Sequence, residues 1–150
     1  TFSSIRIRKL DLSHNKIELL NPRTLGNITQ LEFLLLKSNK LNDKFSLNSF
    51  STSLVELDLS GNLIRKIHRY MFSGLISLQK LFLSNNFIEE IDLDAFGIEL
   101  SKLNRIQLNH NRLRTLKDSQ FYNLKSLEYI YLQYNYIESI NSKIFNGLFK

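Results

Sequence analysis

The sequence predicts an α/β solenoid, in which one structural unit repeats along the chain and all of its strands run parallel. Three observations predict this fold. Six stretches place apolar residues in one frame around an asparagine, and these asparagines are 24, 23, 24, 25 and 24 residues apart. The apolar residues before each asparagine also alternate with other residues. A fixed period of this length indicates a repeat architecture, and the alternation indicates strands with one buried face.

The last unit shows the frame most clearly, since apolar residues lie eight, five and three places before Asn135 and two and five places after it. Each unit is expected to form one short strand around the two apolar residues that lie five and three places before its asparagine. The side chains of these two residues are expected to point inward. These pairs are Leu10 and Leu12, Leu34 and Leu36, Leu57 and Leu59, Leu81 and Leu83, Ile106 and Leu108, and Ile130 and Leu132.

The segment between each asparagine and the next strand is expected to be the return connection. Parallel strands need a crossover, and about 15 residues per unit supply it. A phenylalanine on most returns, such as Phe72 or Phe121, is placed to fill the core from the opposite side. Two units depart from the pattern: Lys44 occupies an apolar position with Phe45 one place late, and one extra residue follows Phe96.

The asparagine itself is expected to bond the turns of adjacent units, because an inward amide both donates and accepts hydrogen bonds where the chain leaves the strand. The predicted ladder consists of Asn15, Asn39, Asn62, Asn86, Asn111 and Asn135. We expect residues 1–150 to form one array of about six repeats that is cut at both ends. With no cysteine in the chain, neither a disulfide nor a thiolate metal site is possible.

The chain has a net charge of +6, but its predicted strand face is balanced. The excess lies on the returns, where acidic residues around Glu89 and Asp92 interrupt the basic ones, and a surface that follows phosphates needs a continuous basic stripe. We therefore expect no nucleic acid partner. The sequence also has no Ser/His/Asp arrangement, glycine-rich phosphate loop or metal-ligand spacing, so we expect no enzyme, no cofactor and no metal.

The outward residues of the last three strands are the candidate ligand site, because tyrosine and arginine are common in binding hot spots. The candidates are Phe82, Arg105, Gln107, Tyr129, Tyr131 and Tyr134. The alternative is that strands simply favour aromatic residues and that these have no partner.

The unit Leu-x-x-Leu-x-Leu-x-x-Asn-x-Ile/Leu-x-x-Ile/Leu, followed by x4-Phe-x-x-Leu, resembles the typical leucine-rich repeat of animal extracellular proteins, among them Toll-like receptors, chaoptin and Slit. The resemblance covers nearly the whole chain. It implies a horseshoe with parallel strands on the concave face and irregular or 3₁₀ returns on the convex side.

The same resemblance implies a receptor or cell-adhesion ectodomain at the cell surface or secreted, with a protein ligand or co-receptor and homo- or heterodimers as candidate partners. Innate immunity is one such setting, and a membrane would be reached only through segments outside this sequence. Two alternatives stay open: a structural or matrix role through lateral packing, and an intracellular scaffold. The sequence Asn27-Ile28-Thr29 is a candidate glycosylation site at Asn27.

Overall fold

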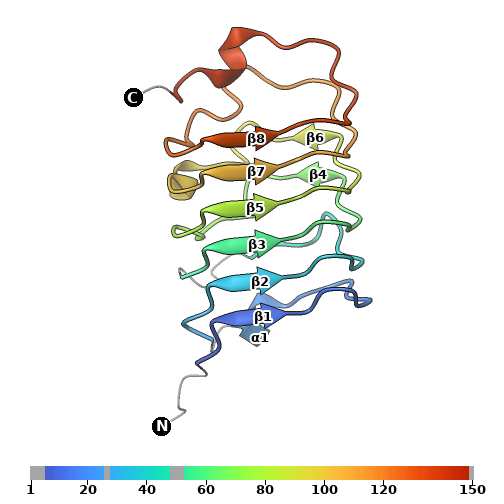
Figure 1. Ribbon diagram of the computed structural model, residues 1–150, viewed down its shortest axis with the longest axis vertical. Helices are drawn as coiled ribbons and strands as arrows, with labels where there is room; N and C mark the ends of the chain where they lie inside the picture. Colours follow the sequence, from blue (N-terminus) through green and yellow to red (C-terminus); the bar gives the residue numbers. More distant parts are fainter. Residues whose placement is uncertain (1–5, 26–27, 48–52, 149–150) are drawn as a thin grey trace.

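A computed structural model describes residues 6–25, 28–47 and 53–148 of the chain. These residues form a parallel-strand solenoid, and its main sheet stacks along the long axis of the molecule (Figure 1). The strands of this sheet, in spatial order, are β1 (Lys9–Asp11), β2 (Phe33–Leu35), β3 (Glu56–Asp58), β5 (Lys80–Phe82), β7 (Arg105–Gln107) and β8 (Tyr129–Tyr131). The predicted fold class and the position of each strand are confirmed.

The register of the sheet places equivalent residues of the repeats side by side. Leu34 pairs with Leu57, Leu57 with Leu81, and Leu81 with Ile106. Each of these four side chains is fully buried. A strand of three residues cannot bury its apolar side alone, so each repeat completes the core of its neighbours.

The returns lie behind the main sheet and are mostly irregular, as predicted (Figure 1). They include the 3₁₀ helices η1 (Ile98–Leu100) and η2 (Ser142–Phe145). Two features were not predicted: one turn of α-helix, α1 (Pro22–Leu25), and a small second parallel sheet of β4 (Lys66–Ile67) and β6 (Glu90–Ile91).

The second sheet forms where two consecutive returns keep the same register. Ile67 lies opposite Ile91, and both side chains are buried. The Asp43 carboxylate accepts hydrogen bonds from the backbone N–H groups of Arg65 (2.6 Å) and Lys66 (3.0 Å). It thereby satisfies donors at the β4 edge, which would otherwise be a free strand edge.

The rings of the return phenylalanines stack behind the leucines. Phe96 and Phe121 have ring centroids 5.8 Å apart, and Phe121 and Phe145 are 6.5 Å apart. In the irregular second repeat, Phe45 is still buried while Lys44 is exposed, so the one-residue shift keeps a ring in the core. The extra residue after Phe96 is accommodated by η1, which begins directly after Gly97.

At the ends of the strands, five of the six asparagines bond adjacent repeats. The Asn86 amide donates to the carbonyls of Leu59 (3.0 Å) and Leu83 (3.1 Å), and its oxygen accepts from the backbone N–H of Ile64 (3.1 Å). Asn39, Asn62, Asn111 and Asn135 make the same three kinds of contact, each with its own repeat and the one before it. Asn15 donates within its own repeat, to the Leu12 and Ser13 carbonyls.

The residue before each asparagine adopts a left-handed backbone conformation, which the sequence pattern did not predict. The φ angles are between 55° and 68° at His14, Ser38, Gly61, Asn85, His110 and Tyr134. Glycine and asparagine tolerate this conformation best, and the other residue types adopt it at some cost. These residues lie at the edge of the sheet where the strands end.

Candidate recognition face

The predicted ligand residues lie together on three neighbouring strands. We call Phe82, Arg105, Gln107, Tyr129, Tyr131 and Tyr134 the tyrosine face. Arg105 pairs in register with Tyr129, while Phe82, Gln107 and Tyr131 form one row across β5, β7 and β8. Because side chains of parallel strands in register lie about 4.8 Å apart, these residues form one continuous surface.

Two ring contacts hold the tyrosine face in place. The Arg105 guanidinium lies over the Tyr129 ring, 4.8 Å from its centroid, and Tyr129 is 46% exposed. The Tyr134 ring stacks on the His110 ring, with centroids 4.3 Å apart and the planes 15° apart. His110 was not among the predicted ligand residues. The shared left-handed conformation of residues 110 and 134 aligns the two rings.

A row of polar side chains lies beside the aromatic residues. The Ser84 hydroxyl is buried, 2.7 Å from the Asn109 amide oxygen and 3.4 Å from the Gln107 amide oxygen. Gln107 is therefore held from one side while its other side faces Tyr131. Fixed side chains lose little entropy when a partner binds.

Several charged groups on or next to β1, β2, β3 and β5 are already paired. Arg8 donates two hydrogen bonds to Glu32 (3.0 and 2.7 Å), and this contact lowers the pKa of Glu32 below its usual value. Hydrogen bonds from Ser13 lower the pKa of Asp11, and Lys80 pairs with Glu56 at 3.3 Å. With a lowered pKa, the carboxyl groups of Asp11 and Glu32 are unsuited to donate protons in acid catalysis.

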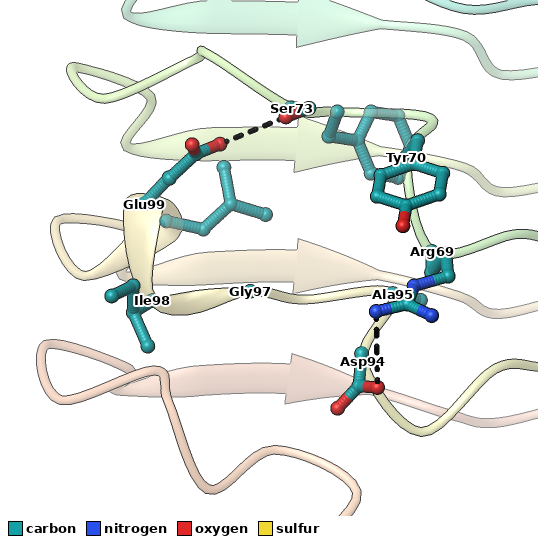
Figure 2. A pocket seen from close by; sticks show the side chains of 10 residues that line it. Arg69, Tyr70, Ser73, Asp94, Ala95, Gly97, Ile98 and Glu99 are labelled. Atoms are coloured by element: carbon teal, nitrogen blue, oxygen red, sulfur yellow. Dashed lines mark hydrogen bonds and ion pairs between the residues drawn. The ribbon is translucent and has the colours of Figure 1, made fainter.

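Two hollows lie outside the tyrosine face. One, of about 230 Å³, lies on the convex side beside η1 (Figure 2). Figure 2 shows Glu99 accepting from the Ser73 hydroxyl (3.1 Å) and Arg69 facing Asp94 (4.0 Å) across it. The charged side chains that line this hollow thus bond other groups of its lining.

The other hollow, of about 400 Å³, lies at the edge where the strands end, and we call it the edge hollow. It is lined by Glu89, Arg112, Arg114 and Tyr136. None of the four was among the predicted ligand residues. The signal for them was present in the sequence, since these residues follow the asparagines at equivalent places, one and three residues on.

Within residues 6–25, 28–47 and 53–148, no group of three or more histidine or acidic residues could hold a metal ion. No helix in the same ranges is long and apolar enough to cross a membrane. The candidate glycosylation site Asn27 lies outside the described residues.

A leucine rich repeat family model matches residues 1–41, 52–97 and 101–150 of the chain. The chain is 35% identical over 100 residues to Toll-like receptor 9 of Mus musculus, covering 64% of this chain and 10% of that protein. It is 34% identical over 99 residues to the human Leucine-rich repeats and immunoglobulin-like domains protein 1, and the match covers 65% of this chain and 9% of that protein. It is 35% identical over 109 residues to Tsukushi of Gallus gallus, covering 69% and 29%.

Solved structures show the same solenoid. The TLR13–ssRNA13 complex matches with a TM-score of 0.71 at 26% identity, covering 92% of this chain and 24% of that one. An internalin from Listeria monocytogenes matches with a TM-score of 0.69 at 26% identity, covering 95% and 38%. The chain therefore spans only a minor part of each of these proteins. The matched family and both structural neighbours are recognition modules without enzymatic activity.

Proposed function

Because the chain belongs to the leucine-rich repeat family and is a protein-interaction module, we propose that it recognises a protein ligand or co-receptor through the tyrosine face. We place it in a receptor or cell-adhesion ectodomain, at the cell surface or secreted. The names of its relatives support this setting, since they include Toll-like receptors 4 and 9.

The observation that carries the proposal is the clustering of aromatic rings on the strand face, two of which, Tyr129 and Tyr134, are exposed. Three of the six tyrosines of the chain belong to the tyrosine face, on or just after β8. An aromatic side chain buries a large area at a small cost in side-chain entropy, and arginine beside it adds directional hydrogen bonds. Such groups are the usual hot spots of protein interfaces.

A protein partner suits this face better than a nucleic acid. One structural neighbour is described as a complex with single-stranded RNA. In the present chain the charged residues of the strand face are mixed, and Glu56 already pairs with Lys80. A phosphate backbone needs several adjacent cationic groups, and neutral tyrosines next to a single arginine do not supply them.

The experiment is a binding screen of the 150-residue chain against an array of purified ectodomains, with single-stranded RNA as a further probe. The test variant is Tyr129→Ala together with Tyr131→Ala. The matched control is Tyr70→Ala with Tyr122→Ala, which removes two exposed tyrosines from the returns. Since hot-spot truncation typically costs about 2 kcal/mol or more, we expect the test variant to bind at least about 30-fold more weakly.

Unchanged binding by the folded test variant would refute the tyrosine face as the site. If the control variant loses binding instead, the convex side makes the contact, and the matrix or scaffold alternatives gain support. Binding of RNA that the test variant abolishes would leave the face as the site but replace the protein partner.

A further inference from the structure

The edge hollow lies next to the tyrosine face around the turn at which the strands end. Tyr134 of the tyrosine face precedes Asn135, and Tyr136 of the hollow follows it. Backbone hydrogen bonds hold the hollow walls in register. The Tyr136 N–H donates to the Leu113 carbonyl (2.9 Å), and Arg112 N–H donates to the Ile88 carbonyl (2.9 Å). Tyr136 therefore lies beside the segment that carries both arginines.

The two arginines of the hollow have unused hydrogen-bond donors. Arg112 contacts the Glu89 carboxylate through one nitrogen at 3.5 Å, and its guanidinium lies 4.7 Å from the centroid of the Phe87 ring. Among the residues that the structure describes, Arg114 makes no ion pair. A guanidinium carries five N–H donors in a planar fork, which fits the two oxygens of a carboxylate.

The surroundings of the hollow limit its ligand to one anionic group. Glu89 and Glu138 occupy the positions equivalent to Arg114 in the repeats on either side. A long polyanion such as a nucleic acid or a sulfated glycan would bring further negative charges against these two carboxylates. A single carboxylate brings only one negative charge beside Glu89, and two guanidinium groups, those of Arg112 and Arg114, line the same hollow.

We propose that the edge hollow binds one aspartate or glutamate side chain of a protein partner, with Arg112 and Arg114 donating to its carboxylate and Tyr136 packing against the adjoining residue. Tyr136 is 62% exposed, so its ring is available for this contact. The inference rests on the proposed function, because it extends the interface of the tyrosine face around the edge of the sheet.

The test is selection of a random 12-residue peptide library displayed on phage against the folded chain. We expect enriched peptides to contain an acidic residue next to an aromatic or large apolar one. The test variant is Arg112→Gln with Arg114→Gln. The matched control, Arg23→Gln with Arg69→Gln, removes the same charge from the convex side. We expect the selected peptides to bind the test variant about tenfold more weakly and the control unchanged, since each partly exposed charge contact contributes a few-fold.

Thermal unfolding followed by circular dichroism verifies that each variant is folded. Enrichment of peptides without acidic residues, enrichment of none, or equal binding to the test and control variants would each overturn the proposal. The tyrosine-face variant Tyr129→Ala with Tyr131→Ala separates the two proposals. Some selected peptides could bind the tyrosine-face variant as well as the parent chain and still require the two arginines. Such peptides would support the edge hollow as a site and count against an interface that continues onto the tyrosine face.

Discussion

The inward and outward residues of the same short strands differ in one respect: the inward ones repeat and the outward ones do not. Leu34, Leu57, Leu81 and Ile106 are all fully buried and interchangeable in chemistry. The outward residues beside them are Phe33, Glu56, Lys80 and Arg105. Because the inward side chains pack against leucine or isoleucine of the neighbouring repeats, burial restricts them to apolar residues of similar size. The outward side chains carry no such restriction and are free to serve recognition.

The largest expected effect comes from breaking the inward row. Leu81→Ala removes a fully buried side chain between two equally buried neighbours. We expect it to lower the free energy of unfolding by about 2–5 kcal/mol, through lost burial and the cavity that remains. Chemical denaturation measures the loss, and the adjacent outward Lys80→Ala is the matched control. We expect Lys80→Ala to cost less than about 1 kcal/mol, as is usual for an ion pair that is still partly exposed to solvent. Similar losses in both variants would contradict the comparison.

The asparagine ladder is expected to be next in magnitude. Asn86→Ala leaves the N–H of Ile64 and the carbonyls of Leu59 and Leu83 without their side-chain partner in a buried position. We expect a loss of about 1–3 kcal/mol in the free energy of unfolding, with a lower thermal midpoint.

The control for this variant uses the neighbouring Asn85, which is exposed and has a φ of 55°. Alanine at that position would be disfavoured by its backbone conformation, so Asn85→Gly is the better matched change. We expect Asn85→Gly to leave the thermal midpoint nearly unchanged. If Asn85→Gly lowered the thermal midpoint as far as Asn86→Ala, the conformation of the turn, and not the hydrogen bonds of the asparagine ladder, would account for the loss of stability.

The smallest expected effect concerns charges on the returns. Lys66 donates to Asp92 (2.9 Å) and contacts Glu90 (3.3 Å), and this lowers the pKa of Asp92 below its usual 3.8. A carboxyl group with a lowered pKa in the folded state stabilises the protein at neutral pH. This contribution begins to fall as the pH drops toward 3.8, and it is lost once the pH passes below the folded pKa.

Denaturation midpoints measured between pH 2.5 and 7 test this expectation. Lys66→Gln is expected to reduce the acid-induced loss of stability, because Asp92 then has a pKa closer to that of the unfolded chain. Lys102→Gln, which removes an exposed lysine near η1, is expected to keep the loss of the parent chain. An unchanged pH dependence in Lys66→Gln would show that the contact has no net effect.

The sequence was sufficient to predict the strands because their pattern depends on period and burial, which residues such as Leu57 and Leu81 display directly. It was insufficient for features that depend on neighbours a full repeat away. The stacking of Tyr134 on His110 needs the left-handed turn before each asparagine, and Gly61 and Asn85 at that position were the available signal. The pairing of β4 with β6 likewise depends on two returns that happen to share a register.

Hydroxyl-radical footprinting of the chain, alone and bound to a partner from the ectodomain array, tests the central claim most directly. The exposed tyrosines report on both sides of the molecule, since Tyr129 and Tyr134 lie on the tyrosine face while Tyr70 and Tyr122 lie on the returns. We predict that a bound partner protects Tyr129 and Tyr134 from oxidation. Tyr70 and Tyr122 are expected to react as fast in the complex as in the free chain. Protection of Tyr70 and Tyr122 with unchanged oxidation of Tyr129 and Tyr134 would contradict recognition by the outward residues of the strands.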